Sequence, residues 1–388
     1  MKRRTFGQLV LAAGATLAAP AVHSANDVLT IGDIAPLTGA GASWGAASAG
    51  GGELAAEEVN EAGGLKVGGK TYQVKVVAYD EQYTAAGCIA AYTRMVQDGI
   101  KYILGPTSSV GALAIKDMVE QNKTIMFSGC YTRKAIDAKT RFFYKNGSTP
   151  VEYGPAMIHW LSQHQPADKR RAVLLNPNDE TGWDGQEVQT KAYNGNGFQV
   201  VGHELYERSL KDFQPVLTKL LADKPDVIEL GTSAPATAGL IVRQAREMGF
   251  TGRFMKNGGP GPLDIIAAAG KEAAEGVVQY AIVDPNNPAY IRLVAKFKKA
   301  KGFEPNETFI LFYDAARVLF AAMQKAGTVT DSDLVQRAMA QVFPFRSALG
   351  DEITLGGMKD YGCNNQFVTA AYVDVIQDGK PVVVGLAK

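Results

Sequence analysis

Short apolar runs alternate with longer stretches of helical periodicity from Val28 onward. Such alternation predicts parallel sheets whose strands are joined by helical crossovers. The strands expected first are residues 28–34, 72–79, 101–105 and 124–128, and the helices between them are residues 46–62, 84–98 and 109–121. Ala62, Gly63 and Gly64 end the first of these helices, because glycine readily adopts the left-handed conformation at a helix end.

A second series of the same kind starts after residues 146–150. Its expected strands are residues 171–176, 198–204, 226–231 and 252–255, and its expected helices are residues 185–194, 212–222 and 235–248. Residues 171–175 and 226–230 have the nearly continuous apolar character of strands that are covered on both faces.

The last part of the chain has a different pattern. Residues 308–325 place apolar side chains along one helical stripe, and Gly327 follows as a stop, so we expect a helix packed on a sheet. Residues 366–384 alternate apolar and polar side chains around Asp378 and Gly379, which predicts a hairpin.

The fold class expected from these patterns is α/β, with two doubly wound parallel-sheet lobes. The chain has 388 residues, and about 363 of them follow the N-terminal segment described next, which exceeds the size at which one core keeps growing. In doubly wound sheets ligands lie beyond the carboxyl ends of the strands. The loops that follow the strands are therefore the places to look for a site.

Residues 1–25 are expected to be an export signal. Lys2, Arg3 and Arg4 form a charged head, residues 9–21 are mostly apolar, and small residues follow. The arginine pair favours a Tat-type signal, although basic heads also occur on Sec signals. Roughly 13 apolar residues are too few to span a bilayer. The mature chain is thus expected in the periplasm.

Charge and cysteine usage exclude several classes of partner and scaffold. Removal of the three basic residues of the head leaves about 37 basic against 39 acidic side chains, so nothing in the net charge favours nucleic acid or an anionic membrane as partner. No later segment approaches 18 consecutive apolar residues, so we expect no direct membrane insertion. Three scattered cysteines allow one disulfide at most.

Motifs of catalysis and metal binding are absent from the sequence. It contains no HExxH, GxSxG, P-loop or CxxC pattern, and His159, His164 and His203 are isolated. Adjacent acids such as Asp80 and Glu81 more often form solvated loops than acid/base pairs. We therefore expect no enzyme, no catalytic residue, no cofactor and no metal.

Four stretches match one protein family in the right order: residues 31–39 (IGDIAPLTG), 57–65 (EEVNEAGGL), 98–105 (DGIKYILG) and 243–249 (RQAREMG). The chain resembles the type I periplasmic solute-binding proteins of ABC transporters, in the branched-chain amino acid (leucine/isoleucine/valine) group. The resemblance covers nearly all of the mature chain.

That resemblance implies two lobes joined by three crossings that close over a small-molecule ligand. One lobe would hold residues 27–148 and 284–355, and the other residues 149–283 and 356–388. It also implies a membrane permease of an ABC transporter as the partner. A periplasmic sensor for a two-component system would have the same fold and stays an alternative.

The first candidate site residues follow two strands of the first lobe. Ser108 and Ser109 precede or begin a helix, where hydroxyls and backbone N–H groups suit a carboxylate, although N-capping is the usual role of serine there. The matching family position of Ser109 binds ligand. By the same resemblance, the loop with Cys130, Tyr131 and Thr132 offers the ligand the hydroxyl of Thr132. A catalytic role for Cys130 would need a basic neighbour, and none is evident, so a small buried side chain is the simpler interpretation.

Aromatic and turn residues complete the set of candidates. Trp44 matches a family position at the cleft edge, and Trp183 is its counterpart from the second lobe, since aromatic walls suit an apolar ligand body; each tryptophan is otherwise explained by core packing. Tyr153, Ser233 and Gly258 are weaker carry-overs from the family, and the first two are also ordinary turn residues.

One departure from the family concerns the ligand's charge. Amino-acid binders of the family place a carboxylate in the loop that corresponds to residues 256–262, and here that loop has none. Unless Glu229, Asp80 or Asp284 takes over, a buried ammonium would lack a partner, which is costly. The ligand expected is a branched-chain amino acid or related carboxylate, with an aromatic or aliphatic acid, an amide or urea as alternatives.

Overall fold

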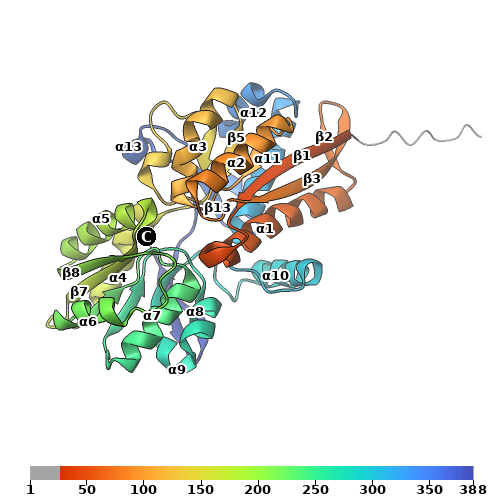
Figure 1. Cartoon of the computed structure of the whole chain (residues 1–388). Helices are drawn as coiled ribbons and strands as arrows, with labels where there is room; N and C mark the ends of the chain where they lie inside the picture. Colours follow the sequence, from red (N-terminus) through yellow and green to blue (C-terminus); the bar gives the residue numbers. More distant parts are fainter. Residues whose placement is uncertain (1–26, 388) are drawn as a thin grey trace, which may run out of the picture.

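The computed structural model describes residues 27–387 as two α/β lobes that meet along one face (Figure 1). Residues 1–26, and with them the predicted signal, lie outside the described residues. Each lobe has a central sheet that is covered by helices on both faces, as expected for doubly wound sheets.

The first sheet is nine-stranded and parallel at its centre, with antiparallel pairs at its edges. Its strands in spatial order are β12 (Phe345–Arg346), β13 (Glu352–Gly356), β14 (Gln366–Val368), β6 (Phe143–Lys145), β5 (Ile125–Ser128), β4 (Tyr102–Leu104), β1 (Asp27–Ala35), β3 (Lys70–Asp80) and β2 (Leu65–Val67). The helices of this lobe are α1 (Ala42–Glu61), α2 (Ala85–Gln97), α3 (Ser109–Asn122), α10 (Pro288–Lys301), α11 (Phe309–Ala326), α12 (Ser332–Met339) and α13 (Met358–Tyr361).

The second sheet is seven-stranded and ends in an antiparallel hairpin. Its strands in spatial order are β16 (Lys380–Leu386), β15 (Tyr372–Gln377), β11 (Val278–Ala281), β10 (Arg253–Lys256), β9 (Val227–Glu229), β7 (Arg171–Pro177) and β8 (Gln199–Tyr206). Its helices are α4 (Pro150–His164), α5 (Glu180–Gly195), α6 (Gln214–Ala222), α7 (Pro235–Glu247), α8 (Pro262–Ala269) and α9 (Lys271–Ala274).

Between residues 27 and 387 the chain passes from one sheet to the other three times. The passages lie between β6 and α4, between β11 and α10, and between β14 and β15. The first and third run side by side, because the Ser148 hydroxyl donates to the carbonyl oxygen of Thr369 (3.1 Å) and accepts from its backbone N–H (3.0 Å). The lobes are thus tied by adjacent strands of chain, as a hinge requires.

The predicted strands and helices of both series are present, but one lobe boundary is wrong. Residues 356–368 were assigned to the second lobe, whereas β14 pairs with β6 and β13 in the first sheet. The predicted hairpin therefore covers only β15 and β16. The alternating pattern extends into β14 because side chains alternate with a period of two in every β-strand, whichever sheet the strand joins.

Close packing in the first lobe depends on a glycine of α1. A Cβ at Gly51 would lie 2.3 Å from the carbonyl oxygen of Phe309, at the start of α11. Only glycine permits this approach of the two helices. The start of α11 is thereby held against α1.

Candidate functional site

A small cavity of about 40 Å³ lies between the two lobes. It is enclosed by loops that follow strands of both sheets and by the first turn of α11, so it lies where doubly wound sheets bind ligands. The residues around it are Trp44, Tyr83, Thr107, Gly129, Tyr131, Thr181, Thr232, Gly259, Thr308, Leu311 and Phe312. None of these side chains carries a charge at neutral pH.

Aromatic side chains form walls of the cavity and also join the lobes. The indole Nε1 of Trp44 donates to the carbonyl oxygen of Pro260 in the second lobe (3.2 Å). The hydroxyl of Tyr131 accepts from the backbone N–H of Gly259 (3.0 Å). The ring of Tyr83 faces the guanidinium of Arg208 at 4.3 Å from the ring centre. The three contacts show the lobes in a closed arrangement.

Three threonine hydroxyls face the cavity, and two of them have no partner among residues 27–387. The Oγ1 atoms of Thr107 and Thr232 are buried and make no hydrogen bond to any of these residues, whereas that of Thr181 lies beside the Tyr83 hydroxyl. Thr107 belongs to the first lobe and the other two belong to the second. A buried hydroxyl without a partner is costly, so these groups indicate where a polar solute would bind.

Helix N-termini surround the same space. Thr107 precedes α3, Thr181 lies in the first turn of α5, and Thr308 is the N-cap of α11 without a side-chain capping bond. The partial positive charge of a helix N-terminus favours negative groups nearby. The cavity therefore combines uncharged walls with an electrostatic preference for an anion.

The two predicted serines and Thr132 lie close by but their hydroxyls are occupied. Ser108 donates to the carboxylate of Glu81 and accepts from the N–H of Gly111 (3.2 Å), so it caps α3. The Oγ of Ser109 accepts from the backbone N–H groups of Tyr131 (3.2 Å) and Thr132 (3.1 Å). These serines thus hold the loops that enclose the cavity, while Thr107 contributes the free hydroxyl.

Thr132 contacts the opposite lobe. Its hydroxyl donates to Oδ2 of Asp184 in α5 (2.6 Å). The same carboxylate oxygen accepts from the backbone N–H of Arg133 (2.9 Å). The side chains of Arg133 and Lys134 pair with Glu187 and Glu180 at 2.5 Å and 2.7 Å.

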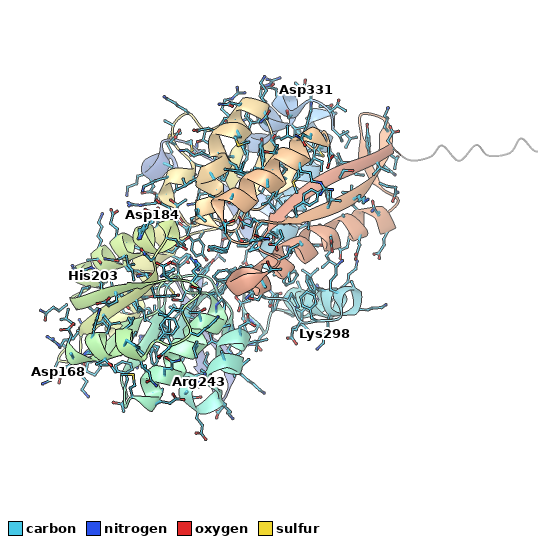
Figure 2. The ribbon with its side chains drawn as sticks, viewed as in Figure 1. Asp168, Asp184, His203, Arg243, Lys298 and Asp331 are labelled. Carbon is cyan, nitrogen blue, oxygen red and sulfur yellow. The ribbon has the colours of Figure 1, made fainter. Side chains whose placement is uncertain are left out.

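Glu180, Asp184 and Glu187 share one face of α5, because they are spaced by four and three residues. Asp184 is only 7% exposed and marks the point where α5 meets the upper lobe in Figure 2. We call residues 132–134 with these three acids the latch. It joins the lobes at one side of the cavity.

The structure separates the other predicted residues into near and distant ones. Tyr131 and Trp44 line the cavity, and Gly258 adjoins it next to the ring of Tyr131. Cys130 is buried behind it, and burial raises the pKa of its thiol. Tyr153 stacks on Tyr280 at a ring-centre distance of 3.8 Å and donates to the carbonyl oxygen of Asn257 (3.1 Å).

Trp183 and Ser233 are not in the cavity wall. Trp183 is 50% exposed, and its Nε1 donates to Oδ1 of Asn178 (3.0 Å). The hydroxyl of Ser233 bonds Leu230 and Tyr206 within the second lobe. Their near neighbours Thr181 and Thr232 line the cavity instead. Trp183 is thus two positions from the wall residue Thr181 in α5, and Ser233 is one position from the wall residue Thr232.

Other wall residues had no marked signal in the sequence. Thr308, Leu311 and Phe312 begin α11, whose stripe predicted packing alone, and Tyr83 follows β3 with a left-handed backbone (φ 56°). A left-handed tyrosine is uncommon and cannot be inferred from residue type.

The three carboxylates proposed as partners of an ammonium group are engaged elsewhere. Glu229 accepts from the N–H groups of Gly231 (2.8 Å) and Asn257 (2.9 Å), from the Asn257 side chain (2.9 Å) and from the Tyr193 hydroxyl (3.0 Å). Asp80 caps residues 37, 38 and 82, and Asp284 accepts from Asn286 (2.9 Å). None of the three lines the cavity.

A buried lysine lies below the loop that carries Gly259. Lys256 is the last residue of β10, and its Nζ donates to the carbonyl oxygens of Gly258 and Gly259. Burial lowers the pKa of Lys256 to about 7, and burial raises that of Glu229 to about 7. Lys256 and Glu229 therefore form their hydrogen bonds with other residues of the second lobe and do not line the cavity.

The remaining features of the described part of the chain concern its cysteines, its possible metal-binding groups and its apolar helices. Cys88, Cys130 and Cys363 are free and buried. Residues 27–387 contain no group of three or more His, Cys, Asp or Glu side chains arranged to hold a metal. No helix in that range is long and apolar enough to cross a membrane.

Comparison with known sequences identifies one family. A family model described as "Periplasmic binding protein" matches residues 28–380. A leucine-, isoleucine-, valine-, threonine- and alanine-binding protein of Pseudomonas aeruginosa is 28% identical over 350 residues, which cover 88% of this chain and 91% of that protein. A Leu/Ile/Val-binding protein of Rhizobium johnstonii is 28% identical over 345 residues, 88% of this chain and 90% of the relative.

Solved structures show the same fold. A leucine-binding protein from Thermotoga maritima superimposes with a TM-score of 0.80 at 24% identity, over 92% of this chain and 98% of that one. A solute-binding protein from R. palustris in complex with benzoate has a TM-score of 0.79 at 20% identity, over 93% and 96% of the two chains.

Proposed function

The chain belongs to the periplasmic binding protein family, and on that premise we propose that it is the periplasmic solute-binding component of an ABC importer. It would hold a small carboxylate-bearing solute between its lobes and deliver it to a membrane permease. The observation that carries this proposal is the closed cavity between the lobes, with uncharged walls and with the hydroxyls of Thr107 and Thr232, one from each lobe, that have no partner among residues 27–387.

The relatives support a carboxylate as the shared feature of the ligand. The protein from P. aeruginosa is named for five amino acids, and the structure from R. palustris contains benzoate. Every one of these molecules has a carboxylate, whereas their remaining parts differ. Helix N-termini and hydroxyls from both lobes suit that common group here.

The mechanism proposed is a conformational equilibrium. Thr107 of one lobe and Thr181 and Thr232 of the other reach the same solute only when the lobes are closed. The solute therefore stabilises the closed form by its extra affinity for it. A permease that recognises the closed form would receive only loaded protein. No bond of the solute is broken, so no catalytic group is required.

Localisation and site are part of the same proposal. Export by residues 1–25 would bring the chain to the periplasm, where the importer's permease is exposed. The residues proposed to contact the solute are the cavity-lining set, of which Trp44 and Tyr131 also close the lobes. Ser109 would act indirectly by holding the backbone of Tyr131 and Thr132.

A pair of tryptophan variants tests the location of the site. In a thermal-shift screen of the purified protein against amino acids and organic acids, at least one carboxylate should raise the melting temperature. Trp44→Ala should remove that increase, because it deletes a wall and the bond to Pro260. Trp183→Ala is the matched control, since that side chain lies outside the cavity.

The result that would reject the site is an unchanged ligand response in the Trp44→Ala variant. If no carboxylate shifts the wild-type melting temperature, the proposed function itself is wrong. Circular dichroism of each variant without ligand confirms that it is folded.

A further inference from the structure

We infer that the solute is an acid without an α-ammonium group. This inference rests on the proposed function and narrows the class of ligand that the same cavity accepts. It follows from the charges and hydrogen bonds around the cavity, which provide for a negative group and leave a positive one without a partner.

An ammonium group in the closed cavity would be buried among neutral side chains. All the residues that line it are uncharged. Burial of an unpaired ammonium costs several kcal/mol or more. Hydroxyls and main-chain carbonyls alone compensate this cost poorly, because the charge still lacks a counter-ion.

The carboxylates of Glu307, Glu229 and Asp184, which lie near the cavity without lining it, already accept hydrogen bonds from the protein. Glu307 precedes the wall residue Thr308, is 8% exposed, and accepts from the backbone N–H of Ile282 (3.1 Å). Glu229 accepts four hydrogen bonds from Tyr193, Gly231 and Asn257. Asp184 accepts from Thr132 and Arg133 across the lobes. To serve an ammonium group, Glu229 or Asp184 would have to give up these bonds, and Asp184 would also have to leave the latch.

The hydrogen-bond donors around the cavity favour a negatively charged group. Thr181 and Thr232 are 5% and 2% exposed and line the cavity, and the hydroxyl of Thr232 has no partner in the described part of the chain. Each can donate a hydrogen bond to a carboxylate oxygen. The first turns of α3, α5 and α11 lie beside them.

Matched pairs of ligands test the inference directly. Each pair shares its carboxylate and carbon skeleton and differs only in the α-ammonium group: acetate and glycine, 4-methylpentanoate and leucine, 3-phenylpropanoate and phenylalanine. Titration calorimetry at pH 7 should show that the acid of whichever pair fits binds at least tenfold more tightly than the amino acid.

A threonine variant connects that preference to the cavity. Thr232→Val keeps the shape of the side chain and removes the hydroxyl, so affinity for the acid should fall about tenfold. Thr218→Val is the matched control, because Thr218 is exposed on α6, outside the cavity.

Two outcomes overturn the inference and are distinct from each other. An amino acid that binds as tightly as its matched acid would show that the cavity accepts an ammonium group, and the proposed importer function would stand. Absence of binding by every acid and amino acid would reject both the inference and a carboxylate solute.

Discussion

Asp33 illustrates how a single buried carboxyl affects the stability of this protein. It lies within β1 with no exposed surface, and the hydroxyl of Ser48 donates to its oxygens at 3.1 and 3.2 Å. Burial, together with the charges of Glu53 and Glu81, raises the pKa of Asp33 to about 8. The folded protein therefore holds a proton there that the unfolded chain releases near pH 4.

The raised pKa of Asp33 makes the folded protein less stable as the pH increases. Because the folded-state pKa is above the unfolded one, the associated stability is present below about pH 4 and is lost as pH rises towards 8. Asp33→Asn removes this titration. Between pH 5 and pH 8 the free energy of unfolding of the variant should therefore fall by a few kcal/mol less than that of the wild type. Urea denaturation at both pH values measures the difference.

Asp168→Asn is the control for this titration, because Asp168 is exposed in a loop of the second lobe (Figure 2). It should leave the dependence of stability on pH as in the wild type. Equal pH dependence in the Asp33→Asn protein would contradict the role given to Asp33.

The cavity residues show how far residue types alone can predict a site. Chemistry and the resemblance favour serine and tryptophan as site residues, and these residues lie in loops or first helical turns near the cavity. Ser108 is bound by Glu81 whereas Thr107 is free, and Ser233 is bound by Tyr206 whereas Thr232 is free. Which of two adjacent hydroxyls points into a cavity depends on backbone direction, which residue types do not fix.

At the scale of elements, α5 connects the lobes through one of its faces. Asp184 in its middle accepts a hydroxyl and an N–H from the first lobe, and Glu180 and Glu187 pair with Lys134 and Arg133. The outer two pairs include exposed side chains and contribute little. The buried bonds of Asp184 are the larger contribution to closure.

Asp184 does not line the cavity, yet Asp184→Ala should weaken ligand binding because it weakens closure. The two bonds to this buried carboxylate cross from one lobe to the other. Their loss should disfavour closure by about 1 to 2 kcal/mol, so the apparent Kd should rise roughly 5- to 30-fold. Titration calorimetry measures this, and Glu272→Ala on α9 is the matched control. An unchanged Kd would mean that the latch does not bias closure.

Elements differed in how well the sequence predicted them. Long periodic segments such as α11, and strands with continuous apolar character such as β7, were found near their observed bounds. The α4 helix was missed although Thr149 and Glu152 form a capping box at its start. The strand β14 has only three residues and lies between β6 and β13 in the first sheet, and its short pattern does not indicate which sheet it joins.

At the scale of the whole molecule, two lobes joined by three chain passages can change their separation with little change inside either lobe. The contacts of Trp44, Tyr131 and the latch all cross the gap between them. The closed arrangement should therefore be one member of an equilibrium.

Small-angle X-ray scattering measures that equilibrium. The radius of gyration should decrease when a saturating acid ligand is added, and the ligand-bound curve should fit the closed arrangement described here. Asp184→Ala without ligand should be at least as expanded as the wild type. Identical curves with and without a bound ligand would contradict closure as the response to binding.

The route of the chain between the sheets also constrains how the protein is made. Both sheets receive strands from residues 345–386: β12, β13 and β14 complete one, and β15 and β16 complete the other. A nascent chain that ends before this segment has two unfinished sheets with open edges, which favour aggregation. The strands that complete both sheets are thus among the last to leave the ribosome, first those of one lobe and then those of the other, so each lobe completes its folding late in synthesis.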